Sequence, residues 1–375
     1  MKKGILLILG SLTLTLNSCG GMSEAAAATT ENAKQVETAD SGTTEVKSEF
    51  DSVEAIDPPD DFREVVEVEE FKGYPDYYDD MVEEYIEKVN EEFEAVGDHG
   101  FAFCFVTDQH VEHNSGYTPY IIKDIYDATP LKYVLNGGDF YDRDDTKEGA
   151  LEKIHSCVRE FEYLDVPLFV TLGNHDLNDN ANTAHEDAYL TMPEFYEQAM
   201  MQMGDQVTYY DRANGKFNYY YYDPDSNTYL VCIQTGVSKL DSAHANFKDT
   251  DAAVLKELLP TLDGNVIIFT HLLNNWKGDF EHVSTWTRLI NAINESGCSD
   301  KVKLVVSGHT HLDQSFDSEG VLHVITTTNS FLKREETEGT TDELAFDTYF
   351  VDYKNGTVKT LRFGRGEDRS FTIPE

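Results

Sequence analysis

Basic residues are scarce in this chain of 375 residues: 29 Lys and Arg stand against 70 Asp and Glu, which gives a formal charge of −41. A surface of that sign repels duplex nucleic acid at long range, so a nucleic-acid duplex is not an expected partner. The acidity is equally compatible with a simple gain in solubility. A polyanionic substrate would require local positive charge, which bound metal ions could supply.

Cysteine is also rare, with five residues and no Cys-x-x-Cys pair. A zinc site made of thiolates is therefore not expected. Cys104 and Cys232 lie in apolar, strand-like runs and are interpreted as small core residues. A core of this size does not require disulfides, and pairing among Cys104, Cys157, Cys232 and Cys298 stays open. The sequence has no His-Glu-x-x-His motif, which disfavours a metallopeptidase or amidase.

The apolar run near the start, Gly4–Leu16, is too short to span a bilayer comfortably. It follows two lysines and precedes Leu16-Asn17-Ser18-Cys19, which resembles a bacterial lipoprotein cleavage box with an unusual Asn17. We expect residues 1–19 to be a lipoprotein signal peptide and Cys19 to carry the lipid. The lipid would anchor the protein to a membrane of the cell envelope, outside the cytoplasm, in the outer membrane or periplasm. An ordinary secretory signal, and a secreted protein, is the alternative.

Composition divides the remainder of the chain. Residues 20–60 are rich in small and acidic residues and are expected to form a flexible acidic tether. Residues 61–97 form an N-terminal helical segment, in which Asp79–Val96 has the apolar spacing of an amphipathic helix that packs on the main body. Residues 98–375 are expected to form the main folded domain.

In that domain, apolar strand-like runs alternate with helical patterns, which favours an α/β fold with parallel pairing. The last three runs resemble antiparallel strands and indicate a mixed sheet or a second sheet. A hairpin is expected at Phe217–Asp223 and Thr228–Thr235, in which the rings of Tyr219–Tyr222 alternate between the two faces. The expected strands are Phe101–Thr107, Leu131–Asn136, Leu168–Leu172, Val266–Phe269, Val302–Val306, Val321–Thr327, Phe346–Tyr353 and Val358–Phe363.

Five polar motifs each follow one of these strands directly. Because parallel strands end at one edge of a sheet, their side chains are expected to meet in one cleft. Each motif alone is weak evidence, since a single His at a strand end is usually a surface or core residue. Together they contain enough Asp, His and Asn side chains to bind two metal ions. The motifs are Asp108-Gln109-His110, Gly138-Asp139-Phe140-Tyr141-Asp142-Arg143, Gly173-Asn174-His175-Asp176, Thr270-His271 and Gly308-His309-Thr310-His311.

In order and spacing, the five motifs resemble the calcineurin-like metallophosphoesterase superfamily. The resemblance covers about residues 98–365 and implies a four-layer αββα sandwich of two mixed β-sheets flanked by helices. It also implies a binuclear centre of Mn, Fe, Zn or Co, whose identity the ligands do not decide. The implied first site is Asp108, His110, Asp139 and His311; the second is Asp139, Asn174, His271 and His309, so that Asp139 is shared.

The implied activity is hydrolysis of a phosphomonoester or phosphodiester by a hydroxide that bridges the metals. By the resemblance, His175 protonates the leaving oxygen and Asp142 orients His175. Arg143, with Asn174, is expected to contact the phosphate. Asp142 and Arg143 could instead pair with each other at the strand end. Asp144 replaces the Gly of the protein Ser/Thr phosphatase branch, which disfavours phosphoproteins as substrates.

The alternative function is a non-catalytic metal-binding surface scaffold, or binding protein, on the same fold. The expected partner is a small phosphoester substrate of unknown identity, and the protein is expected to be a monomer. Specificity is expected to lie in Asn178–Asp211 and in the loops after His271 and His311, where the pattern is least regular.

Overall fold

The computed structural model describes residues 73–110, 115–179, 186–211, 216–236, 247–273, 283–330 and 337–374. These residues belong to one compact unit, Val53–Glu375. The expected signal peptide, Cys19, the tether over 20–60 and residues 61–72 of the helical segment lie outside the described residues. None of the helices in the described part of the chain has the length and apolar character needed to cross a bilayer.

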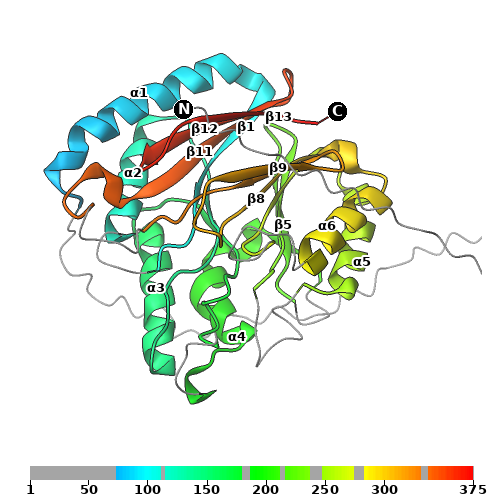
Figure 1. Cartoon of the computed structure of the whole chain (residues 1–375), viewed down its shortest axis with the longest axis horizontal. Coiled ribbons are helices and arrows are strands. Elements are labelled where there is room, and N and C mark those ends of the chain that lie inside the picture. The colour runs from blue at the N-terminus through cyan, green and yellow to red at the C-terminus, as the bar shows by residue number, and fades with distance from the viewer. Residues whose placement is uncertain are drawn as a thin grey trace, which may run out of the picture. The chain divides into compact units, whose positions relative to one another are not determined.

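The described strands form two mixed sheets (Figure 1). The first sheet has the order β13-β12-β11-β1-β2-β3, and its strands β1, β2 and β3 are parallel. Of the last three runs, all expected to be antiparallel, the two in this sheet pair antiparallel. The third, Val321–Ile325 in the second sheet, pairs antiparallel on one side and parallel on the other. Their bounds are Gly100–Val106 for β1, Val134–Asn136 for β2, Leu168–Val170 for β3, Ala345–Asp352 for β11, Thr357–Gly364 for β12 and Arg369–Thr372 for β13.

The second sheet has the order β4-β5-β6-β7-β8-β10-β9, and β6, β7, β8 and β10 are parallel. The hairpin of β5 and β6 is antiparallel, as the sequence predicted. The bounds are Thr208–Tyr209 for β4, Tyr219–Asp223 for β5, Thr228–Cys232 for β6, Asn265–Phe269 for β7, Val302–Ser307 for β8, Gln314–Ser318 for β9 and Val321–Ile325 for β10.

Helices flank the two sheets, which confirms the predicted fold class (Figure 1). The helices α1 and α2 lie on the side of the first sheet, and α5 and α6 pack together on the side of the second. The bounds are Asp79–Val96 for α1, Thr118–Ala128 for α2, Lys147–Tyr163 for α3, Met192–Phe195 for α4, Asp249–Leu258 for α5 and Val283–Glu295 for α6.

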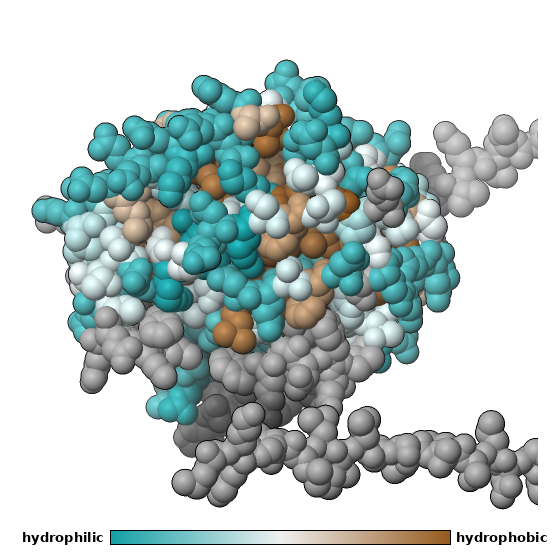
Figure 2. All heavy atoms as spheres, turned by 45° about the horizontal axis from the view of Figure 1, so that its top comes forward, coloured by the Kyte–Doolittle hydropathy of each residue, from teal (hydrophilic) through white to brown (hydrophobic). Residues whose placement is uncertain are grey.

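Helix α1 packs on β11 and β12, because its apolar stripe needs a partner. Val82, Tyr85 and Val89 are buried, and the hydroxyl of Tyr85 donates to the backbone oxygen of Leu361 at 2.8 Å. Each buried side chain of this size contributes about 1.5–3 kcal/mol. Much of the face that includes this helix is hydrophilic, and apolar side chains show only in small groups (Figure 2).

The central strands are buried on both faces, which is why they read as continuous apolar runs. In β7, Ile267 and Phe269 join the core shared by the two sheets, whereas Val266 and Ile268 pack in the core that contains residues of α5 and α6. The tyrosine run follows the same alternation. Tyr219 and Tyr221 belong to the first core, and the rings of Tyr220 and Tyr222 contact that of Tyr229 on the other face.

The insert between β3 and β4 does not form one continuous α-helix. A four-residue α4 continues into a π-helix, Tyr196–Met200, and then into 3-10 turns over Met201–Gln206 that are broken by a kink at Gly204. Met192, Phe195 and Met200 are buried. Packing of these apolar residues against α3 therefore sets the path of the chain here more than helix propensity does.

The four cysteines in the described part of the chain, Cys104, Cys157, Cys232 and Cys298, are free thiols. Cys104 and Cys232 are buried strand residues, which confirms their interpretation as core side chains. Burial raises the pKa of both thiols, so neither is a reactive thiolate.

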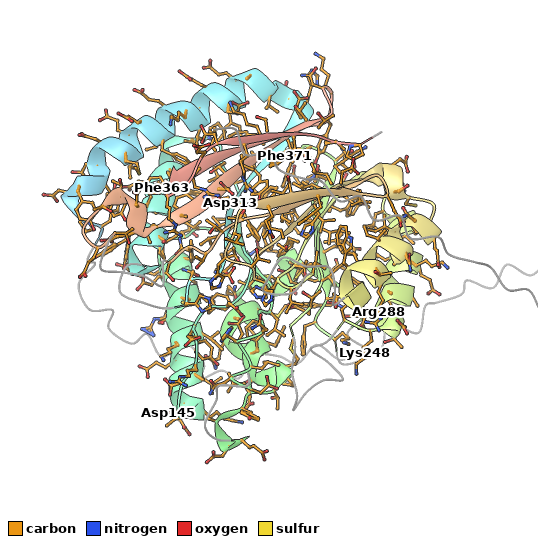
Figure 3. All side chains as sticks on the ribbon, in the orientation of Figure 1. Asp145, Lys248, Arg288, Asp313, Phe363 and Phe371 are labelled. Carbon is orange, nitrogen blue, oxygen red and sulfur yellow. The ribbon has the colours of Figure 1, made fainter. Side chains whose placement is uncertain are left out.

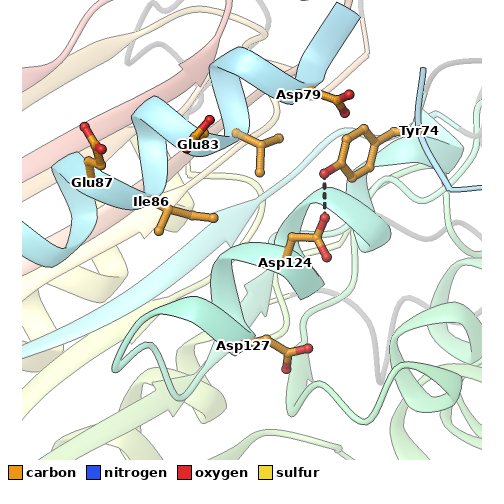
Figure 4. A pocket seen from close by; sticks show the side chains of 8 residues that line it. Tyr74, Asp79, Glu83, Ile86, Glu87, Asp124 and Asp127 are labelled. Atoms are coloured by element: carbon orange, nitrogen blue, oxygen red, sulfur yellow. Dashed lines mark hydrogen bonds between the residues drawn. The ribbon is translucent and has the colours of Figure 1, made fainter. Parts of the chain in front are cut away.

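A groove of about 490 Å³ lies between α1 and α2 (Figure 4). The hydroxyl of Tyr74 donates to Asp124 Oδ2 at 2.5 Å, which ties the segment before α1 to α2. The rim of the groove is acidic, and its floor includes Val82 and Ile86. The groove contains none of the residues that the motifs singled out.

The buried ring of His323, on β10, makes the stability of the fold depend on pH. Its ring is fully buried against Trp286, with Ser307 Oγ 2.7 Å from Nε2, and burial lowers its pKa to about 3. An unfolded His titrates at about 6.5, so the neutral ring stabilises the fold fully above pH 6.5 and loses that contribution as the pH falls toward 3.

We expect the metal-free protein to lose about 2 kcal/mol between pH 6.5 and 5 through this group alone. A His323→Gln variant keeps a polar side chain beside Ser307 but does not titrate. Urea unfolding of both proteins across this range should show the steeper pH dependence in the wild type. Parallel curves would contradict the assignment.

Candidate metal centre

All five motifs begin where a buried strand ends. Asp108 follows β1, Asp139 follows β2 and Asn174 follows β3, all in the first sheet. His271 follows β7 and His309 follows β8, in the second sheet. The loops meet through the backbone, as when Asp108 N donates to Gly138 O at 2.9 Å. The carboxyl ends of parallel strands from both sheets thus converge on one place.

One cluster contains Asp108, His110 and His311, whose ligand atoms lie within 4.8 Å of one another. Nε2 of His110 is 3.0 Å from Nε2 of His311, which in turn is 3.1 Å from Asp108 Oδ1. Two imidazole nitrogens that face each other at this distance need a proton or a cation between them. Asp108 Oδ1 is buried and accepts no hydrogen bond within the described residues. This donor set fits a metal ion.

The other cluster contains Asp139, His271 and His309. Nδ1 of His271 donates to the Gly137 carbonyl at 2.7 Å, which points Nε2 inward. That nitrogen faces two oxygens, Asp139 Oδ2 at 3.2 Å and Asn174 Oδ1 at 3.1 Å. A proton on Nε2 therefore occupies the position where a cation fits, and metal binding displaces it.

The two clusters are neighbours. His309 N donates to Asp108 Oδ2 at 3.0 Å, and His110 N donates to the backbone oxygen of Asp139 at 3.1 Å. Asp139 groups with the second cluster, and its place as a ligand shared by both sites stays a prediction. All seven predicted ligands lie in this region, namely Asp108, His110, Asp139, Asn174, His271, His309 and His311. Mixed carboxylate, imidazole and amide ligands suit several transition metals.

The backbone at the centre adopts a conformation that non-glycine residues rarely take. Positive φ angles occur at Asp108 (55°), His110 (48°), Asp139 (54°), His309 (73°) and His311 (57°). Such residues cost about 1–3 kcal/mol each and cluster at functional sites. The motif glycines permit close approach, since a Cβ on Gly138 would overlap the backbone of Gly173.

Charges at the centre match the needs of metal ligands. Burial raises the pKa of Asp108, but His311 and His271 outweigh it and bring the pKa to about 2. Burial lowers the pKa of His309 to about 4, and the charge on His271 adds to that effect. Burial also lowers the pKa of His271, yet Asp139 raises it to about 9. At neutral pH Asp108 and Asp139 are ionised and His309 is neutral, whereas His271 carries a proton that a metal ion must displace.

Asp176 supports the centre structurally, and the sequence did not single it out beyond its place in a motif. Its Oδ2 accepts from Asp139 N at 3.0 Å and Gly173 N at 2.7 Å, and its Oδ1 accepts from Phe140 N at 2.8 Å. The buried carboxylate thus joins the two loops that carry Asp139 and Asn174. The only sequence signal was an acid directly after Asn174-His175.

His175 lies beside both clusters and belongs to neither. Nδ1 donates to the backbone oxygen of Asp142 at 2.6 Å, whereas the Asp142 carboxylate is 3.4 Å away and 59% exposed. Nε2 is 4.0 Å from Asp139 Oδ2. The backbone of Asp142 therefore makes the shorter contact to the ring. Arg143 is exposed on the same loop, and Asp144 pairs with Lys153 of α3 at 3.0 Å.

The chain belongs to the calcineurin-like phosphoesterase family, whose model matches residues 101–313. Family membership and the two ligand clusters suggest a dinuclear metal site, with the metals unidentified. A search of curated proteins finds no significant match.

Solved structures include similar folds at low sequence identity. A dimetal phosphatase from Danio rerio is 14% identical with a TM-score of 0.54, over 73% of this chain and 99% of that one. GAP50, the anchor in the inner membrane complex of Plasmodium, is 13% identical with a TM-score of 0.45, over 74% and 90%. The first of these shows the fold and no more.

Proposed function

We propose that this protein is a binuclear metal-dependent phosphoesterase that hydrolyses a small phosphomonoester or phosphodiester. The observation that carries the proposal is His175. Its imidazole lies next to the ligand clusters, oriented by a 2.6 Å hydrogen bond, although neither cluster includes it. A protein that bound metals only for stability or for scaffolding would have no use for an oriented acid at this position.

When bound, two cations supply positive charge for the phosphoryl oxygens and a nucleophile at neutral pH. The ligands Asp108 and Asp139 are ionised and would hold that charge in a buried site. Arg143, on the exposed loop after β2, would bind the remaining phosphate oxygens, together with the Asn174 amide.

His175 would donate a proton to the leaving oxygen. Burial lowers the pKa of its ring, but Asp139 and the backbone oxygen of Asp142 raise it more, so the net pKa lies above the usual value. Nδ1 is occupied by the Asp142 carbonyl, which leaves the proton on Nε2 for transfer. A raised pKa increases the fraction of the protonated ring, which is the form that a general acid requires.

The test uses the purified full chain, stripped with a chelator and reloaded with Mn, Fe, Zn or Co. We expect chelation to abolish phosphate release from nitrophenyl phosphate or bis-nitrophenyl phosphate and reloading to restore it. A panel of nucleotides, sugar phosphates and diesters then ranks substrates. A protein that carries two metal equivalents and hydrolyses none of these compounds would sink the proposal in favour of the scaffold.

We also propose that lipid on Cys19 tethers the enzyme outside the cytoplasm. The support is the basic, apolar and Leu-Asn-Ser-Cys order of residues 2–19. Radiolabelled palmitate should label the wild type and not a Cys19→Ala variant. An unlabelled wild type that is still exported would exclude the tether.

A further inference from the structure

A buried ion-pair network joins the first sheet to the metal-binding loop of the second. Asp313 is two residues beyond the ligand His311 and immediately precedes β9. Arg362 of β12 reaches it with both terminal nitrogens, Nη2 to Oδ1 at 2.6 Å and Nη1 to Oδ2 at 3.0 Å. Figure 3 shows Asp313 close to the strands that carry Phe363 and Phe371. This bidentate geometry fixes direction as well as distance.

The other side of the guanidinium is held just as firmly. Nε of Arg362 donates to Asp347 Oδ1 at 2.8 Å, and Nη2 donates to Asp347 Oδ2 at 3.1 Å. The side chains of Arg362 and Asp347 are 1% and 0% exposed. Arg369 of β13 also donates to Asp347 Oδ2, at 2.7 Å. The guanidinium of Arg362 is therefore held rigidly by residues of the first sheet.

The pair of Arg362 and Asp313 is connected to His311 through one further residue. Thr327, just after β10, donates its hydroxyl to the backbone oxygen of His311 at 2.8 Å and its N–H to Asp313 Oδ1 at 3.2 Å. The loop is thus held on both sides of Leu312. His311 has φ 57°, a conformation that relaxes unless its surroundings hold it.

We propose that Asp313 and Arg362 are positioning residues for the metal ligand His311. The inference rests on the metal centre of the proposed function, and it assigns part of that centre to β12, which lies outside the matched residues 101–313. Residues that support metal ligands from outside typically change metal affinity when they are lost. A purely structural ion pair would change stability alone.

Asp313→Ala is the main test, because the Asp313 side chain is 28% exposed and the Arg362–Asp347 pair survives its loss. Asp313→Asn keeps one acceptor and should be intermediate. Glu92→Gln is the matched control, since it breaks the ion pair of Lys359, on the same strand β12, with α1. Each chelated full chain is titrated with Co(II) by absorption spectroscopy and calorimetry, and its thermal unfolding is measured without metal.

We expect Asp313→Ala to weaken one of two metal-binding steps about 10- to 100-fold and to change the Co(II) spectrum. Glu92→Gln should bind both ions like the wild type. Two results overturn the inference: wild-type affinity and spectrum in Asp313→Ala, or an equal loss in Glu92→Gln. A wild type that binds no metal removes the proposed function as well, whereas two tightly bound ions in both proteins remove this inference alone.

Discussion

Replacement of His175 by alanine should lower turnover about 100- to 10,000-fold while two metal ions stay bound, since this is the range that a positioned general acid contributes. The imidazole lies outside both ligand clusters, so its removal leaves their donors in place. The loss should be larger for an alkyl phosphate than for nitrophenyl phosphate, because nitrophenolate leaves without a proton. Initial rates and metal content on the same preparations measure both effects.

Asp142→Ala is the control for this experiment. The ring of His175 is held by the backbone oxygen of Asp142 at 2.6 Å, and that oxygen survives the substitution. We expect a loss well below that of His175→Ala. Full turnover in His175→Ala, or loss of its metals, would contradict the assigned role; an Asp142→Ala loss as large as that of His175→Ala would show that the carboxylate orients the ring.

Asp139→Asn should abolish tight binding of at least one ion and, if Asp139 is shared, of both. One carboxylate oxygen faces His271 Nε2 at 3.2 Å, and the other accepts from His175 N at 2.8 Å. An amide keeps the shape but loses the charge that balances a buried cation. The loss of affinity should exceed the roughly 10- to 100-fold that follows removal of an outer partner.

Metal content after dialysis, measured by elemental analysis, distinguishes these outcomes. Asp142→Asn makes the same chemical change on the same loop at an exposed position, and it should retain both ions. Two retained ions in Asp139→Asn would show that Asp139 is not a required ligand. One retained ion would assign Asp139 to a single site.

The fold and the position of the centre were predictable because they depend on short-range patterns. Strands such as β7 and β8 are buried on both faces, so they read as apolar runs whose ends are sharp. The ligands follow those ends within a few residues. The apolar runs of β11 and β12 were recognisable for the same reason, and their antiparallel pairing was expected.

What the sequence did not reveal depends on which surfaces meet in three dimensions. The contact of His175 with the Asp142 carbonyl involves a backbone atom, and no residue pattern encodes it. The Arg362–Asp313 pair links residues 49 positions apart, one in β12 and the other in the loop before β9. Asp176 had a visible place in a motif, yet its three backbone donors come from loops whose approach the sequence does not state.

The most direct test of the central claim is the anomalous scattering of crystals of the metal-loaded protein. Two peaks about 3.5–4 Å apart are predicted, as in other two-metal sites. One should lie among Asp108, His110 and His311, and the other among Asp139, Asn174, His271 and His309. A single peak, or His271 and Asn174 turned away from the bound metal, would contradict a binuclear centre.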